Sequence, residues 1–145
     1  MQVVVCPIAR DVDVFVVMQR AHELAAALDF DDIDRTKIEI AVLELARNIL
    51  AHARNGELQI ETVEAGGRRG IAVEARDSGP GIANIELALR DGYSTANTLG
   101  AGLPGVKRLM DAFQIESTVG VGTRVRAVKW PVRRRSEAPL GRRRP

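Results

Sequence analysis

The chain has 145 residues, the size of one domain, and its 46% hydrophobic content is enough to build a core. Only 3% of the residues are aromatic, which argues against a nucleic-acid surface based on stacking. Residues 133–145 hold six of the 21 basic residues and one of the 19 acidic ones, so residues 1–132 carry a net charge of −3. We interpret this arginine-rich tail as a solvated, disordered segment. Contact with nucleic acid, acidic lipid or an acidic partner is the alternative.

The chain contains one cysteine, Cys6, which excludes an internal disulfide and a zinc or iron–sulfur site made of cysteines. The N-terminus lacks the basic start of a signal peptide, and no stretch approaches the roughly eighteen apolar residues of a membrane span. We therefore expect a cytoplasmic protein with no membrane contact.

The first half of the chain is predicted to contain one strand and two helices. The β-branched run 3–8 indicates a short strand, placed at a sheet edge because it ends near Pro7. Helical spacing of apolar residues follows over 11–28. A second helix is predicted from Asp34 to about Ala53, where Gly56 ends it.

The second half is predicted to form two hairpins with helices between them. Alternating residues indicate strands at 58–63 and 71–76, joined by a turn at Gly66, Gly67 and Gly70, and at 114–118 and 123–128, joined through Gly120 and Gly122. A short helix is expected over 84–90 and another from about 104 to 113. The whole predicts an α/β two-layer sandwich: a mixed, mostly antiparallel sheet with helices on one face.

The helix over 34–53 carries two different rows of side chains. Ile38, Val42, Leu45 and Ile49 follow helical spacing and should face the core. Beside them, Glu44, Asn48 and His52 form a polar row that can line a cavity or lie on a solvated helix edge. The Asn48 carbonyl suits Mg²⁺, and Glu44 could polarise a water or hydroxyl.

The segment Asp77-Ser78-Gly79-Pro80-Gly81-Ile82 directly follows a predicted strand. Its two glycines permit a close bend, which holds the Asp77 carboxylate where it can accept a hydrogen bond from an exocyclic amine such as that of adenine. Taken alone, the segment is more typical of an ordinary turn.

The segment Gly100-Ala101-Gly102-Leu103-Pro104-Gly105 leads into the last predicted helix. Glycines before a helix expose backbone N–H groups, and the helix dipole adds positive charge, so the segment can hold phosphates. It is neither a Walker loop nor a Rossmann fingerprint. A glycine loop without a ligand is the alternative.

Together, these motifs and the late Gly122-Thr123 pair resemble the GHKL ATP-binding fold shared by DNA gyrase, histidine kinases and anti-sigma kinases. The resemblance spans roughly residues 3–130. Within that superfamily, the strings ELARNI at 44–49 and GYSTANTLGAGLPGVKRLMDAF at 92–113 look like the stressosome serine/threonine switch kinases of the RsbT type.

The resemblance implies a role for each motif residue. Glu44 would be the general base, Asn48 would coordinate Mg²⁺, and Asp77 would bind adenine. Residues 92–99 would form an ATP lid. The base would lie beside Gly79, Gly81, Ile82 and Thr123, and the phosphates would contact Gly100, Gly102, Leu103 and Gly105.

The function implied is an ATP-dependent serine/threonine kinase. It would phosphorylate a STAS-domain scaffold or antagonist and then bind a downstream effector such as a phosphatase. The alternative is an anti-sigma factor that binds ATP and sequesters a sigma factor. A histidine-kinase catalytic domain is disfavoured because there is no dimerisation helix pair with a phospho-accepting histidine, and a nucleic-acid protein would depend on the arginine tail alone.

Overall fold

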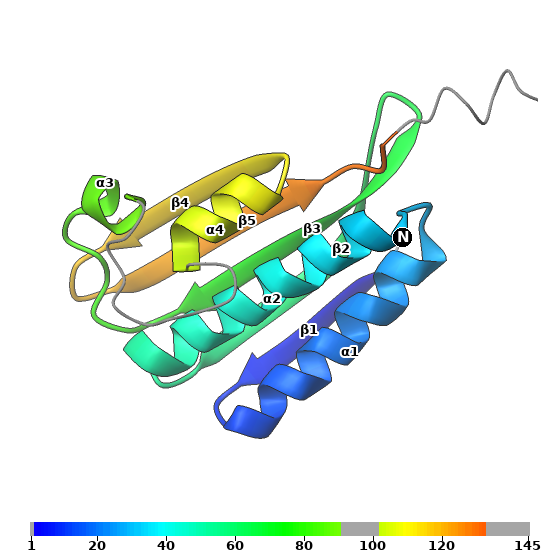
Figure 1. Cartoon of the computed structure of the whole chain (residues 1–145). Helices are drawn as coiled ribbons and strands as arrows, with labels where there is room; N and C mark the ends of the chain where they lie inside the picture. The colour runs from blue at the N-terminus through cyan, green and yellow to red at the C-terminus, as the bar shows by residue number, and fades with distance from the viewer. Residues whose placement is uncertain (1, 91–101, 133–145) are drawn as a thin grey trace, which may run out of the picture.

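The protein is a two-layer sandwich in which the helices cover one face of a five-stranded sheet (Figure 1). The computed structural model describes residues 2–90 and 102–132. The strands are β1 (Val3–Ile8), β2 (Gly56–Ala65), β3 (Arg68–Asp77), β4 (Ala112–Thr118) and β5 (Gly122–Lys129), and the helices are α1 (Asp11–Ala27), α2 (Asp32–His52), α3 (Ile85–Ala88) and α4 (Gly102–Leu109).

The strand order is β1-β2-β3-β5-β4, and all four pairs are antiparallel. The predicted sandwich is therefore confirmed, with β1 at an edge as expected and a sheet that is antiparallel throughout the described residues. The β2–β3 turn consists of Gly66 and Gly67, both with positive φ. Gly70, predicted to belong to that turn, instead lies in β3 and packs against Trp130.

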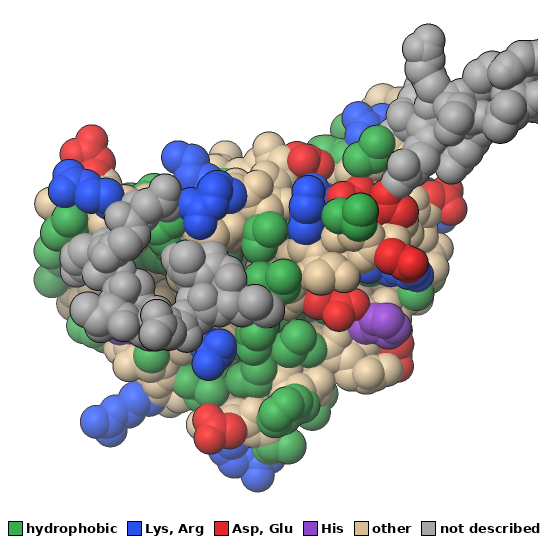
Figure 2. Space-filling view, viewed as in Figure 1, with side chains coloured by type: hydrophobic (Ala, Val, Ile, Leu, Met, Phe, Trp, Pro, Cys, Tyr) green, Lys and Arg blue, Asp and Glu red, His purple; other side chains and the backbone are tan. Residues whose placement is uncertain are grey.

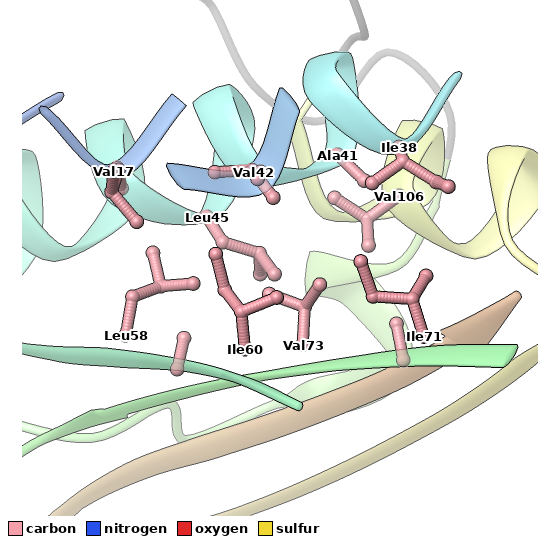
Figure 3. Close-up of a cluster of buried hydrophobic side chains, with 14 of the residues drawn as sticks. Val17, Ile38, Ala41, Val42, Leu45, Leu58, Ile60, Ile71, Val73 and Val106 are labelled. Carbon is pink, nitrogen blue, oxygen red and sulfur yellow. The ribbon is translucent and has the colours of Figure 1, made fainter. Parts of the chain in front are cut away.

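The core lies between the helices and the sheet (Figure 3). Every residue predicted for the inner row of α2 is buried, as are most of the inward positions of β2, β3 and β5. Members of this core include Val17, Ile38, Val42, Leu45, Ile49, Leu58, Ile60, Ile71, Val73, Val106 and Val125. Hydrophobic burial of this extent is the main force that fixes α2 over the sheet.

Helix α1 is apolar on two sides. Its inner side packs on the sheet, while Val12, Phe15 and Val16 are exposed on its outer side. Figure 2 shows hydrophobic side chains at the surface over this helix. Among residues 2–90 and 102–132, no helix combines the length and the hydropathy that a bilayer crossing requires.

The end of α2 differs from the prediction. Gly56 does not stop the helix; it begins β2 and pairs with Asp77. The chain instead turns at Arg54, which adopts a left-handed φ of 73° directly after the C-cap residue Ala53. A single left-handed residue is a common way to end a helix.

The prediction for α4 is wrong at both ends. The helix begins at Gly102, two residues early, because Pro104 is tolerated within a first helical turn. It ends at Leu109 because Ala112 and Phe113 pair with Val128 and Ala127 of β5. The short helix predicted over 84–90 is α3, and the Asn84 side chain caps its start.

Candidate nucleotide-binding site

Asp77 and Thr123 form the centre of the candidate site at one end of the sheet. Asp77 ends β3 and lies directly opposite Thr123 of β5. Side chains alternate along a strand, so Asp77 shares the helix-facing side with Val73 and Ala75. Thr123 likewise shares that side with Val125. Both residues are half-buried, which leaves a carboxylate and a hydroxyl accessible side by side.

The loop after Asp77 is held tightly on both sides. The backbone N–H of Gly79 donates to Asp77 Oδ1 at 2.9 Å. A Cβ on Gly79 would come within 2.6 Å of the Ala53 side chain, at the end of α2. Gly81 has a φ of 80°, and a Cβ there would lie 2.4 Å from the Thr118 carbonyl oxygen. Because Gly79 and Gly81 have no side chains, the loop can pack closely between α2 and the β4–β5 hairpin.

Ser117 joins this loop to the sheet and was missed in the sequence. The Ile82 N–H donates to Ser117 Oγ at 2.7 Å, and Ser117 Oγ lies 2.7 Å from Thr123 Oγ1. It also donates to the Gly122 carbonyl at 3.1 Å. Its position in the sequence could have revealed it. Phe113, Ile115 and Ser117 occupy the inward positions of β4, and Ser117 is the one polar residue among these three.

The polar row of α2 passes from the core to the surface. Glu44 is 3% exposed, Asn48 is half-buried and His52 is exposed. Asn48 precedes Ala53, the neighbour of Gly79, by five residues, which corresponds to about 7 Å along the helix axis. The row therefore runs toward the Asp77 loop from the layer above the sheet.

Helix α4 packs against α2 and supplies the other described part of the glycine motif. Gly102 opens the helix with a φ of 72°, and Leu103 and Gly105 are buried in its first turn. The N–H groups of Gly102 and Leu103 have no acceptor within the helix, as at any helix start. Gly100 and the predicted lid, 92–99, lie outside the described residues.

A groove of about 500 Å³ lies at the same end of the sheet, but largely on the face without helices. Its lining includes the outward side chains of Arg76 and Arg124 as well as Asp77 and Thr123. Glu44 and Asn48 are not part of this groove as the described residues form it. It therefore adjoins the base end of the candidate site and is distinct from the predicted phosphate end.

The donor set fits a magnesium ion held largely by phosphates and water. Among the described residues, no group of three or more His, Cys, Asp or Glu side chains is arranged to hold a metal. Asn48 offers one amide oxygen at a half-buried position of α2, the helix that packs against α4. Mg²⁺ commonly binds proteins through so few ligands when it accompanies nucleotide phosphates.

Residues 9–129 match the family described as histidine kinase-like ATPase domain. The chain belongs to this family. It is 45% identical over 118 residues to the serine/threonine-protein kinase RsbT of Bacillus subtilis, covering 81% of this chain and 89% of that protein. The anti-sigma F factor of a Thermoanaerobacter species is 33% identical over 111 residues, covering 73% and 77%. That of Caldanaerobacter subterraneus is 33% identical over 115 residues, covering 77% and 80%.

These similarities confirm the predicted family and the prediction of a kinase. Membership in an ATPase family also implies that the chain uses ATP.

Proposed function

We propose that this protein is a serine/threonine kinase that transfers the γ-phosphoryl group of ATP to a STAS-domain protein and then binds a downstream effector such as a phosphatase. The observation that carries this proposal is the 45% identity to a serine/threonine-protein kinase across most of both chains. The site supports it, because Asp77 and Thr123 lie opposite each other on the helix-facing side of the sheet, and α2, which carries the polar row, packs against α4.

In this proposal the nucleotide spans the two layers. Asp77 accepts a hydrogen bond from the adenine amine, with Gly79, Gly81, Ile82 and Thr123 around the base. The start of α4, with Gly100 before it, binds the phosphates through backbone N–H groups. Asn48 would hold Mg²⁺, which would neutralise charge on the phosphates.

Glu44 takes the proton of the incoming hydroxyl. As that oxygen forms its bond to the γ-phosphorus, the bond to the β-phosphate oxygen breaks and ADP leaves. The near-complete burial of Glu44 supports this role, since it shields the carboxylate from water.

The test is Glu44→Gln. We expect phosphoryl transfer from labelled ATP to STAS-domain proteins of the same genome to fall by about a thousandfold, while the Kd for ATP changes little. Glu39→Gln is the matched control, because Glu39 lies on the same helix and bonds to His22 at the surface. Transfer at the full rate in Glu44→Gln would disprove the role of Glu44.

An anti-sigma factor is the second candidate function, and the relatives named anti-sigma F factor favour it. A pull-down against sigma factors distinguishes the two. Stable capture of a sigma factor without phosphorylation of any STAS protein would favour the binding function over the proposed kinase.

A further inference from the structure

The hydroxyl groups of Ser117 and Thr123 lie next to the proposed base pocket and are only 2.7 Å apart. A hydroxyl group has one proton to donate, so the direction of this short bond determines what Thr123 can offer a ligand. The neighbours of Ser117 determine that direction.

Ser117 Oγ has three partners among the described residues. The Ile82 N–H can only donate to it, and the Gly122 carbonyl can only accept from it, at 3.1 Å. The single Ser117 proton is then used by Gly122. In the arrangement that satisfies all three contacts, Thr123 then donates its own proton to Ser117 across the remaining contact, since the Ser117 proton is already directed at Gly122.

We propose that Ser117 is a positioning residue that makes Thr123 an acceptor toward the nucleotide base, so that the pocket selects a purine with a 6-amino group. This inference rests on the proposed adenine site. With its proton turned to Ser117, Thr123 Oγ1 presents lone pairs alone. The Asp77 carboxylate opposite it also only accepts, and Gly79 already donates to Oδ1.

Two adjacent acceptors fit the two N–H bonds of a 6-amino group. They oppose a 6-carbonyl oxygen, which is itself an acceptor and would be buried against lone pairs. The arrangement is fixed rather than adaptable, since Ser117 is bonded both to the Asp77–Ile82 loop and to β5. Gly122 also packs so closely on Asp77 that a Cβ would lie 2.1 Å from the Asp77 carbonyl oxygen.

The experiment measures the Kd of the full chain for ATP and for inosine triphosphate, which carries a 6-carbonyl in place of the 6-amino group. In the wild type we expect ATP to bind more tightly. In Ser117→Ala the Thr123 proton is free to turn toward the base, so the ratio of the inosine triphosphate Kd to the ATP Kd should fall about fivefold to tenfold.

Two matched variants separate this effect from a loss of structure. Thr118→Ala removes a hydroxyl from the next residue of β4, on the opposite face of the sheet, and should leave the ratio unchanged. Thr123→Val removes the acceptor itself and should lower the ratio, whereas Thr123→Ser keeps the hydroxyl and the ratio.

A ratio within twofold of the wild-type value in Ser117→Ala overturns the inference while the proposed function stands. If Ser117→Ala does not unfold cooperatively in urea, Thr123→Val decides: an unchanged ratio there overturns the inference equally. A wild-type chain that binds neither nucleotide overturns the proposed function, and this inference with it.

Discussion

The two ends of the β3–β5 ladder each carry a charged residue on the helix-facing side of the sheet. The two residues differ in how deeply they are buried and in what they bond to. At one end Asp77 pairs with Thr123, and at the other Ile71 pairs with Lys129. Lys129 is 5% exposed, and its Nζ lies 3.9 Å from Asp34 Oδ1 of α2 and 3.6 Å from Asp111 Oδ1. Asp77 stays half-buried, and within the described part of the chain its carboxylate is bonded only by the N–H of Gly79 in its own loop.

The difference shows what separates a structural charge from one available to a ligand. The Lys129 charge is balanced by a residue of the helical layer, so it fastens the start of α2 to the sheet. The partner of Asp77 lies two residues away in the chain, so the carboxylate keeps an accessible oxygen. Burial against a second layer, rather than residue type, decides which end keeps a charged group accessible.

The largest expected effect is on stability, at the Lys129 end. Lys129→Met should lower the free energy of unfolding by about 3 kcal/mol, because it leaves the Asp34 carboxylate buried without its cation. Asp34 Oδ2 already has no hydrogen-bond partner among the described residues. Urea denaturation measures the change, and adding Asp34→Leu should recover most of it. A midpoint equal to that of the wild type would show that this end is not an anchor.

The next effect is on binding, at the Asp77 end. Asp77→Asn should raise the Kd for ATP about thirtyfold, since a charged acceptor becomes a neutral amide. Stability should change little, because the amide oxygen can still accept from Gly79. Calorimetric titration with ATP gives the Kd, and Lys129→Met is the control that should bind ATP normally. Equal loss of binding in both variants would remove the distinction between the two ends.

The smallest effect lies on the opposite face of the same strand. Glu74 is 3% exposed and accepts hydrogen bonds from Arg76, Arg124 and Arg126 at 2.6, 3.0 and 3.2 Å. Burial alone raises the pKa of Glu74, but the hydrogen bonds from Arg124 and Arg76 outweigh it and hold the pKa below its ordinary value.

Glu74→Gln should therefore cost about 1.5 kcal/mol of stability at neutral pH. A carboxyl with a lowered pKa stabilises the fold above its unfolded value of 4.5, and that contribution disappears as the pH falls through the folded pKa. Urea titrations of both proteins between pH 7 and acidic pH measure the difference. A gap that stayed constant with pH would exclude ionisation of Glu74 as its source.

Local pattern predicted most of the secondary structure, and it failed where distant partners compete. The strand 3–8 and the buried row of α2 follow from periodicity alone. The end of α4 does not follow from periodicity. Ala112 and Phe113 are compatible with a helix, but they form strand β4 because they pair with Val128 and Ala127 of β5. Glu74 lies on the outward face of β3, yet it is 3% exposed and is bonded by Arg124 and Arg126 of β5, contacts that the pattern within β3 does not encode.

Local sequence motifs also predicted part of the candidate site. Asp77, Gly81 and Thr123 were found through motifs, and the structure brings Asp77 and Thr123 opposite each other and seats Gly81 against the β4–β5 hairpin. The contact of Gly79 with Ala53 could not be foreseen, since it depends on where α2 ends. The roles given to these residues and to Glu44, Asn48 and the start of α4 remain proposals that the variants above test.

The sequence by itself determined the family, the layer architecture and the positions of the acceptor residues, because each depends on spacing within a short stretch of chain. Only the tertiary structure decided that Ser117 bonds to both Ile82 and Thr123, and that the Lys129 side chain is buried against a carboxylate while Asp77 stays accessible. The first outcome depends on a hydrogen bond between Ile82 and Ser117, which are 35 residues apart in the sequence. The second depends on a charge from the helical layer, and no local pattern encodes either.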